Sequence, residues 1–246
     1  MLHSTVHFSV ASDAAWAPGV ETREAWQRWA CDDLHIGAGP EPALRAMPAM
    51  QRRRLGLLGK MALEVGYRCL GDQVNVPTIF CSRHGEVSRS LELLRDLASG
   101  EPLSPTSFAL SVHNAIGGMF SIARNDQAYQ IALSARQSTI EHAVIEACGL
   151  LADGEKAVLL VACETPLPSL YAHYQDEDEQ PYAWAWLIEP PREDVISLSW
   201  SACAGVQERT AKCLPAGLDI LRFHLRRERR MERVCGKHAW EWARNA

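Results

Sequence analysis

Cysteine and histidine are the residues of this chain that could act as nucleophiles and bases. The 246 residues include eight cysteines and nine histidines. No two cysteines have the CxxC spacing of zinc ribbons and redox motifs, and most lie in apolar runs. We therefore expect free cysteines that serve as small hydrophobic residues. For Cys163, beside Glu164, a reactive thiol is the alternative. We expect no metal site and no cofactor.

Three histidines are candidate bases, and each also has a structural interpretation. His113 is favoured as a hydrogen-bonded histidine at a packed helix, and His84 as a turn histidine that holds the loop before a helix. His142 lies five residues after Gln137, a rotation of about 500° along a helix, and should point away from it. No G-x-S-x-G motif occurs, which argues against a serine hydrolase.

The segment SPTSFALSVHNAIGGMFSI (104–122) is the most distinctive part of the sequence. Ser104 and Pro105 are typical of a helix start. Asn114 follows an apolar run, where a buried amide would need hydrogen-bond partners. Gly117 and Gly118 each cost a helix about 1 kcal/mol relative to alanine. We expect them to mark a close backbone approach to another helix or another subunit.

Alternating and helical patterns place these residues on a series of elements. Residues 182–188 and 195–200 read as neighbouring antiparallel strands, 11–20 as a loop, 31–50 as irregular and 171–180 as an acidic loop. The remaining predicted elements are strands 3–10, 77–81, 129–134 and 156–163, and helices 21–30, 51–70, 87–98, 138–151 and 214–233. Helices that alternate with apolar strands predict an α/β fold with a layered mixed β-sheet and helices on both faces. No linker is evident, so we expect one domain over 1–246.

Bulk properties exclude several classes of protein. With 25 basic and 30 acidic side chains, the formal net charge is -5, which argues against nucleic acid as a partner. No run of 18 apolar residues occurs, so we expect no membrane span. The N-terminus lacks the basic and apolar regions of a secretory signal, and we expect a cytoplasmic location.

Segment 104–122 resembles part of the N-terminal half of a β-ketoacyl synthase, an enzyme of the thiolase-like fold. In that family an N-A-x-A-G-like helix precedes a strand and a cysteine that caps a buried helix. Counting forward without gaps from Asn114 places the cysteine position at Gln137. Together with CSRHGE (81–86) and PYAWAWLI (181–188), the segment resembles a stand-alone ketosynthase N-terminal-domain family of aryl-polyene and xanthomonadin-type pathways. The resemblance covers about residues 25–200 and implies a thiolase-like half-fold.

The same resemblance implies that this chain has no ketosynthase activity of its own. Decarboxylative condensation needs a thiolate to hold the acyl chain. The amide of Gln137 cannot form a thioester. Condensation also uses two histidines that lie in the second half of full-length ketosynthases, and no H-G-T-G-like or N-x-F-G-F-G-like motif occurs here. Gln137 would either fill the former nucleophile site or make a functional contact there.

Members of this family resemble chain length factors, the inactive partners of an active β-ketoacyl synthase. The resemblance implies a heterodimer in fatty-acid-like polyketide biosynthesis that uses the helices of 104–122 and the strand 129–134. This subunit would wall one end of the acyl pocket, with Phe108, Met119 and Phe120 as candidate wall residues. The interface and pocket candidates are Phe108, His113, Asn114, Gly117, Gly118, Met119, Phe120 and Gln137.

A basic run near the C-terminus has two interpretations. It contains the candidate residues Arg226, Arg227, Arg229 and Arg230. They form either a solvated helix face or a docking surface for an acidic acyl carrier protein. Two rival functions stay open, an autonomous acyltransferase or hydrolase and a scaffold that binds carrier protein. We expect the isolated chain to form a homodimer when its partner is absent.

Overall fold

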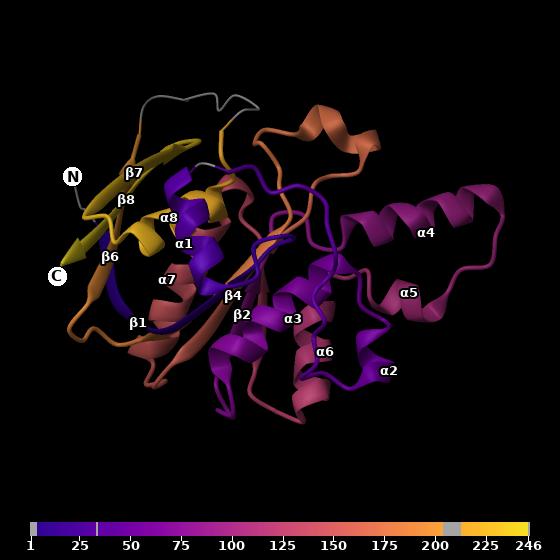
Figure 1. Cartoon of the computed structure of the whole chain (residues 1–246), viewed down its shortest axis with the longest axis horizontal. Coiled ribbons are helices and arrows are strands. Elements are labelled where there is room, and N and C mark those ends of the chain that lie inside the picture. Colours follow the sequence, from indigo (N-terminus) through magenta and orange to yellow (C-terminus); the bar gives the residue numbers. More distant parts are fainter. Residues whose placement is uncertain (1–3, 33, 204–212, 246) are drawn as a thin grey trace.

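One mixed sheet runs through the computed structural model, which describes residues 4–32, 34–203 and 213–245 (Figure 1). Within these residues it has eight strands in the order β3-β2-β4-β5-β1-β6-β8-β7. The strands are β1 (Ser4–Trp16), β2 (Thr78–Cys81), β3 (Gln130–Leu133), β4 (Val158–Glu164), β5 (Tyr182–Glu189), β6 (Val195–Ala202), β7 (Arg230–Cys235) and β8 (His238–Asn245). Strands β3, β2 and β4 are parallel, and the other pairs are antiparallel.

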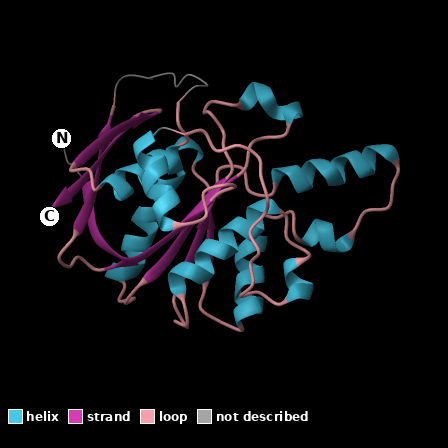
Figure 2. Cartoon of the chain, viewed as in Figure 1, coloured by secondary structure: helices cyan, strands magenta, loops and turns pink. Residues whose placement is uncertain are grey.

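Helices cover both faces of the sheet, as predicted (Figure 2). Residues of α1 (Arg23–Asp32), α7 (Thr139–Ala152) and α8 (Ala216–Arg226) pack into one core cluster, and those of α3 (Leu57–Leu70) and α6 (Ala115–Arg124) into the other. Strand β5 shows why both faces are apolar. Trp184 and Trp186 face the first cluster while Ala183 and Ala185 face the second, because side chains alternate along a strand.

Two helices extend from the body of the molecule as an arm (Figure 1). Helix α4 (Val87–Ser99) ends at Gly100, whose φ of 72° lies in the left-handed region. Helix α5 (Pro105–Ala109) begins where Ser104 accepts a hydrogen bond from the Ser107 N–H at 3.2 Å, so the predicted helix start is confirmed. We call residues 87–112 the α4–α5 arm. The remaining short helices are α2 (Ala49–Arg52), η1 (Arg136–Ser138) and η2 (Ser169–Tyr174).

Several predicted element boundaries are wrong. Strand β1 continues to Trp16 through the segment predicted as a loop, with a shift in register between Val10 and Ser12. It lies between β5 and β6, so those two strands are not neighbours. The predicted helix 51–70 begins only at Leu57, and 104–122 divides into α5 and α6. Residue 3 of the first predicted strand lies outside the described residues.

The predicted basic helix 214–233 is also wrong in its second half. Helix α8 ends at Arg226, because Arg227 takes a left-handed φ of 52°. Residues from Arg230 then form β7, which pairs with β8 along the edge of the sheet. None of the described helices is long and apolar enough to cross a membrane.

Candidate functional site

A cavity of about 770 Å³ lies where the parallel strands β3, β2 and β4 end. The loop after β2 contributes residues 83–84, the turn after β3 contributes 135–138, and Leu167 follows β4. The helix η2 and the turn 235–238 between β7 and β8 also contribute, as do Val87, His142 and Asp176. Carboxyl ends of parallel strands are where α/β folds place their binding sites, because several loops converge there.

Gln137 lies in the sharp turn that leads from β3 into α7. Its neighbour Arg136 has a φ of 54°, a left-handed conformation that costs a non-glycine residue energy and is often found at functional sites. Thr139 begins α7, so the turn holds Gln137 just before a buried helix. The position predicted for a nucleophile therefore has the strand, turn and helix arrangement that presents one, but it holds a carboxamide that lines the cavity.

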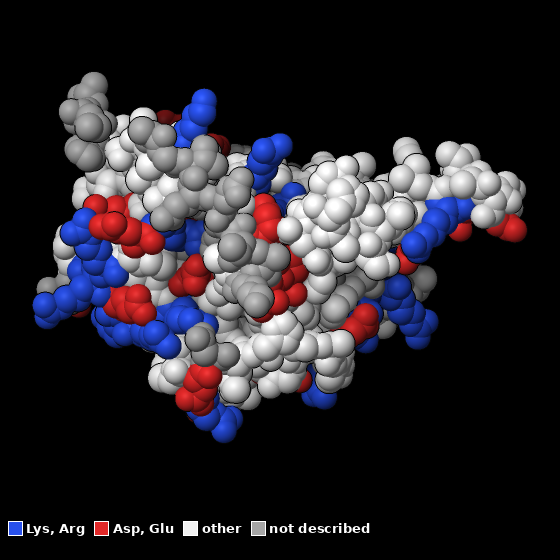
Figure 3. Space-filling model, turned by 90° about the horizontal axis from the view of Figure 1, so that it is seen from above, with Lys and Arg blue, Asp and Glu red and all other residues white. Residues whose placement is uncertain are grey.

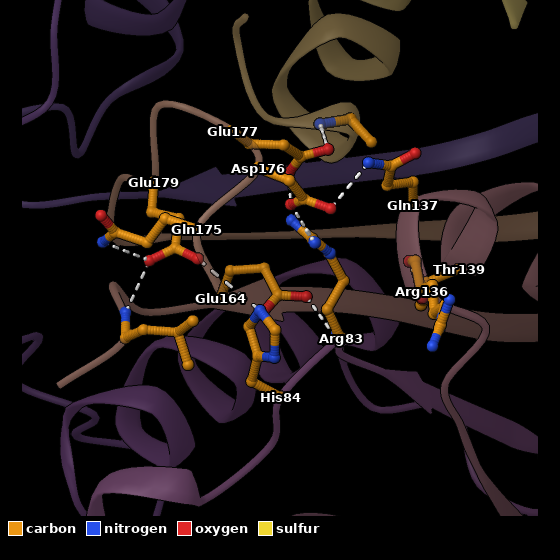
Figure 4. A network of polar contacts seen from close by, with 12 residues as sticks. Arg83, His84, Arg136, Gln137, Thr139, Glu164, Gln175, Asp176, Glu177 and Glu179 are labelled. Atoms are coloured by element: carbon orange, nitrogen blue, oxygen red, sulfur yellow. Dashed lines mark hydrogen bonds and ion pairs between the residues drawn. The ribbon is translucent and has the colours of Figure 1, made fainter. Parts of the chain in front are cut away.

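Asp176 connects Gln137 to Arg83 (Figure 4). Gln137 Nε2 donates to Asp176 Oδ2 over 2.6 Å, and Arg83 Nη2 donates to Asp176 Oδ1 over 2.5 Å. Burial opposes ionisation of Asp176, but these donors and the Arg83 charge outweigh it and lower the pKa of Asp176. A carboxylate can only accept hydrogen bonds, so the amide nitrogen of Gln137 must face Asp176. Its oxygen is turned the other way (Figure 4).

Arg83 and Glu177 anchor this network in the interior. Arg83 Nη1 donates to Glu177 Oε2 over 2.6 Å, and their side chains are 8% and 2% exposed. The other oxygen of Glu177 accepts the N–H of Ala216, the first residue of α8, at 3.3 Å. The acidic loop predicted over 171–180 therefore does not simply face solvent. Part of it is a buried connection between the turn of Gln137, the end of β2 and α8.

A second group of carboxylates supports the loop after β2. Glu164 accepts hydrogen bonds from the Arg83 backbone N–H and from Ser82 Oγ at 2.5 and 3.1 Å, and burial raises its pKa to about 7. His84 Nε2 lies 3.6 Å from Glu179 Oε1. Burial opposes ionisation of Glu179, but the contact with His84 and other donors lowers its pKa. His84 thus holds the loop before α4, in agreement with its structural interpretation.

Aromatic and sulfur side chains form another wall of the cavity. The rings of His142 and His238 lie 5.4 and 5.7 Å from that of Trp240. The thiol of Cys235 is 3.9 Å from the Gln137 carbonyl oxygen. Our expectation that His142 points away from the Gln137 site is wrong, because both line the cavity. Gln137 lies in η1 and not in the helix, so the rotation of 100° per residue does not apply between them.

The other interface candidates do not gather around Gln137. Phe108 is 64% exposed on the α4–α5 arm. His113 Nε2 lies 3.2 Å from the carbonyl oxygen of Leu133, and its ring lies so close to Gly85 that a Cβ there would be 2.6 Å from Nδ1. Asn114 is exposed just before α6, so the expectation of a buried amide is wrong. Ala115 and Ile116, which follow it, pack against the core, whereas Asn114 itself faces outward.

The two glycines of α6 have different surroundings. A Cβ on Gly117 would lie 1.9 Å from Gln130 Oε1 and 3.2 Å from Phe80, whereas Gly118 has no atom within 4 Å of that position. Within this chain, the close approach at Gly117 is therefore to the chain's own sheet and not to another helix. Met119 and Phe120 are 7% and 3% exposed and belong to the same core as α3.

The arginines predicted to bind carrier protein lie at the other end of β7 from the cavity, and three of them already have acidic partners. Arg226 contacts Glu228 at 3.6 Å, Arg227 contacts Asp194 at 3.1 Å, and Arg230 contacts both Glu232 and Glu241. Acidic and basic side chains are also interspersed on the face seen in Figure 3. The expected helix face of arginines is not formed, because α8 ends at Arg226.

The cysteines are free, as the sequence predicts. All eight are free, and four, including Cys163, are buried. Burial raises the pKa of Cys163 well above its usual value, as expected for a structural thiol. The sequence analysis missed Arg83, Asp176 and Glu177 as site residues. A usable signal was present, since an arginine two residues after a buried strand is favoured to pair with a carboxylate if it is buried, and the acidic loop supplies one.

Comparisons with known proteins agree with this architecture. The family model described as "Beta-ketoacyl synthase, N-terminal domain" matches residues 26–243. One similar solved structure is the ketosynthase ApeO in complex with its chain length factor ApeC from Xenorhabdus doucetiae. The TM-score is 0.82 at 27% identity, covering 97% of this chain and 99% of the matched chain.

Two more distant structures share the fold. One is the AntDE:AntF complex of a type II polyketide acyl-carrier protein with its ketosynthase, with a TM-score of 0.72 at 10% identity, covering 98% of this chain and 99% of that one. The other is the ishigamide ketosynthase/chain length factor, with a TM-score of 0.63 at 12% identity, covering 81% and 68%. A comparison with curated proteins gives no match. The match of the family model over most of the sequence shows that this chain belongs to the β-ketoacyl synthase family, through its N-terminal domain.

Proposed function

We propose that this chain is a non-catalytic ketosynthase-like subunit, a chain length factor that pairs with an active β-ketoacyl synthase in polyene or fatty-acid-like polyketide biosynthesis. Gln137 carries this proposal. It lines the cavity from the turn before α7, where condensation requires a thiolate. An amide has no nucleophilic lone pair of useful basicity, and the nitrogen of this one donates to Asp176.

The similar structures support a subunit of this kind. The Xenorhabdus doucetiae complex joins a ketosynthase to a chain length factor, and its matched chain is covered almost completely by this one. Two chains that cover each other over 97% and 99% have nearly equal lengths. The AntDE:AntF structure holds an acyl-carrier protein with its ketosynthase, which supports a carrier protein as a further partner. All four arginines proposed for that contact are exposed. Three of them form ion pairs with acidic side chains, so Arg229 is the best remaining candidate among the described residues.

The proposed contact with the ketosynthase uses β3 and the α4–α5 arm. Strand β3 is at the edge of the sheet, so one side of its backbone is available for pairing. Exposed apolar side chains on the arm are Leu94, Leu97, Leu103, Phe108 and Val112. Because Phe108 is exposed and Phe120 is buried, Phe108 is the wall residue that would reach the partner's acyl pocket. Met119 and Phe120 would support the wall from the core.

Co-expression with an active β-ketoacyl synthase from the same organism tests this proposal. We expect a heterodimer by size-exclusion chromatography with light scattering, and a changed product length when Phe108→Ala is introduced. Leu34→Ala is the matched control, because it removes an apolar side chain that is 54% exposed in the segment after α1, outside the arm and β3. Failure to associate, or an unchanged product distribution with Phe108→Ala, would contradict the proposal.

An alternative function has one observation in its favour. Cys235 lines the same cavity as His142 and His238, which could be combined into a thiol-based acyltransferase or hydrolase. Its side chain lies between the Arg233 guanidinium and the Gln137 carbonyl oxygen, at 3.8 and 3.9 Å, and the residue is 5% exposed. Labelling with a thiol-directed acyl probe distinguishes the two functions. A chain length factor should stay unlabelled at Cys235.

A further inference from the structure

We propose that Glu164 is a proton-dependent latch for the α4–α5 arm, in which the neutral carboxyl group keeps the base of the arm closed and the carboxylate opens it. We call residues 82–86, which lead into α4, and His113, which follows the arm, the arm base. In its closed state the arm base excludes water from Glu164, and in its open state it admits water. The inference concerns the isolated chain and goes beyond the pairing with a ketosynthase.

Both ends of the arm meet in the arm base. The ring of His113 lies so close to Gly85 that a Cβ there would be 2.6 Å from Nδ1, and Gly85 has a left-handed φ of 56°. His113 Nε2 also lies 3.2 Å from the Leu133 carbonyl oxygen, and Ser134 Oγ donates to the Arg83 carbonyl oxygen over 3.0 Å. From this point the arm extends away from the body of the molecule (Figure 1). A change in the arm base therefore changes how the arm is held.

One carboxyl group at the end of β4 connects the parts of this loop. Glu164 Oε1 accepts from the Arg83 backbone N–H over 2.5 Å, and Oε2 accepts from Ser82 Oγ over 3.1 Å. Ser82 Oγ in turn accepts from the Gly85 N–H over 2.8 Å. Figure 4 shows the hydrogen bond between Arg83 and Glu164. The closed arm base therefore depends on the contacts of Glu164.

The charge of an ionised Glu164 is poorly compensated. The Arg83 guanidinium is directed to Asp176 and Glu177, at 2.5 and 2.6 Å. Among the described residues, Glu164 forms no ion pair with a basic side chain. Burial raises the pKa of Glu164 to about 7, although hydrogen bonds and the charges of neighbouring basic groups lower it. The titratable groups around it are Arg83, His84, Glu177, Glu179, Tyr182, Cys81 and Cys163.

The two protonation states of Glu164 favour different states of the arm base. A neutral carboxyl group can remain in the closed base, because the Ser82 hydroxyl can either donate to it or accept from it. A carboxylate gains hydration when water enters, and opening returns the pKa of Glu164 toward its ordinary value of 4.5. Protons therefore bind more tightly to the closed state, and a rise in pH favours opening. With these two pKa values, the opening equilibrium should increase about tenfold from pH 6 to pH 8.

Hydrogen exchange of single amides in the full-length chain, followed by NMR, tests the inference. The Arg83 and Gly85 N–H groups are the reporters, because both hydrogen bonds must break when the arm base opens. After correction for the intrinsic exchange rate, we expect their protection factors to fall about tenfold between pH 6 and pH 8. The Ala128 N–H is the internal control. It donates to Asp126 over 3.0 Å in the turn before β3, at the other end of the parallel strands, and its protection should stay unchanged.

Glu164→Gln is the variant that removes the titration. Its amide oxygen can still accept from the Arg83 N–H, and its side chain cannot ionise. We expect equal protection of Arg83 and Gly85 at pH 6 and pH 8 in this variant. Glu101→Gln is the matched control, because it removes an exposed carboxylate from the arm itself and should retain the wild-type change. Should Glu164→Gln not fold, the comparison of the reporters with Ala128 in the wild-type chain still decides the question.

Three results would overturn the inference. They are reporter protection that stays constant or rises with pH, the same fall in the Ala128 control, and a fall that persists in Glu164→Gln. Heterodimer formation is measured separately at pH 6. A normal heterodimer beside reporters that do not respond to pH would reject this inference alone, whereas responsive reporters without a heterodimer would reject the proposed function alone.

Discussion

Arg233 and Glu141 form an ion pair in the interior, with 3.0 Å between Arg233 Nε and Glu141 Oε1 and side-chain exposures of 5% and 0%. Arg233 is on β7 and Glu141 is on α7, the helix that follows Gln137. Arg233 also contacts Asp219 of α8 at 3.0 Å. The pair therefore joins the edge hairpin of β7 and β8 to the helix that supports the turn of Gln137.

Removing one member of this pair should be costly. Arg233→Met leaves Glu141 buried without its guanidinium, and we expect a loss of about 3–5 kcal/mol in the free energy of unfolding. Arg230→Met is the control on the same strand, where a side chain that is 61% exposed should contribute less than about 1 kcal/mol. Urea denaturation measures both. The double variant Arg233→Met/Glu141→Leu should recover most of the loss, and a failure to do so would contradict this account of the pair.

The contact between Asp176 and Gln137 should have a smaller effect. Asp176→Asn removes a charged acceptor shared by Arg83 and Gln137, and we expect about 1 kcal/mol of destabilisation, limited by the 37% exposure of this side chain. Asp178→Asn in the same loop is the control, because its contact with His35 is exposed and asparagine keeps an oxygen that can accept from Gln180. Thermal unfolding of the two variants side by side gives the comparison. Equal melting temperatures would mean that the Asp176 contacts contribute no stability.

The two glycines of α6 should respond differently to alanine. Gly118→Ala should raise the free energy of unfolding by about 0.5–1 kcal/mol, because the Cβ meets no atom within 4 Å and the helix gains propensity. Gly117→Ala should be the less stable of the two variants, because its Cβ would meet Gln130 and Phe80. Chemical denaturation ranks them. If Gly117→Ala were as stable as Gly118→Ala, the side chains of Gln130 and Phe80 would have to move and accommodate the new Cβ, which would contradict this prediction.

Stability should depend on pH through Glu164. Its pKa is about 7 in the folded chain, against an ordinary value of 4.5. Between these values the folded state holds a proton that the unfolded state has lost, so this group's contribution falls as pH rises from about 4.5 to about 7. Glu164→Gln should therefore become more stable relative to wild type between pH 5 and pH 8, by about 2 kcal/mol or less. Glu101→Gln, at an exposed position, should show no such trend in urea denaturation.

Local sequence patterns predicted the elements that build the site. The apolar run of β4, the turn after β3 and helix α7 lie where the sequence places them, because these segments have strong periodicity or continuous burial. The order of strands was beyond such patterns. Strand β1 lies between β5 and β6 in the sheet. The local sequence patterns of β5 and β6 do not indicate that each pairs with a strand so distant in the chain. The single domain over 1–246 stays a prediction. If it is correct, the chain should unfold in one cooperative transition.

The errors at charged residues have a common physical cause. The arginines after α8 and the acidic loop of Asp176 and Glu177 both look like solvated surface in the sequence. In the structure Arg233 and Glu177 are buried, because each has an oppositely charged partner far away in the chain. Their pairing depends on the fold and not on neighbouring residues. The same reason explains why Asp176 could not be connected to Gln137 from the sequence.

The central claim is that this chain pairs with a ketosynthase and does no chemistry itself, and native mass spectrometry of the co-expressed complex tests it most directly. After incubation with an acylated carrier protein, the account predicts one copy of each subunit, with the acyl adduct on the ketosynthase alone. An acyl adduct on this chain, or the absence of a complex, would contradict it.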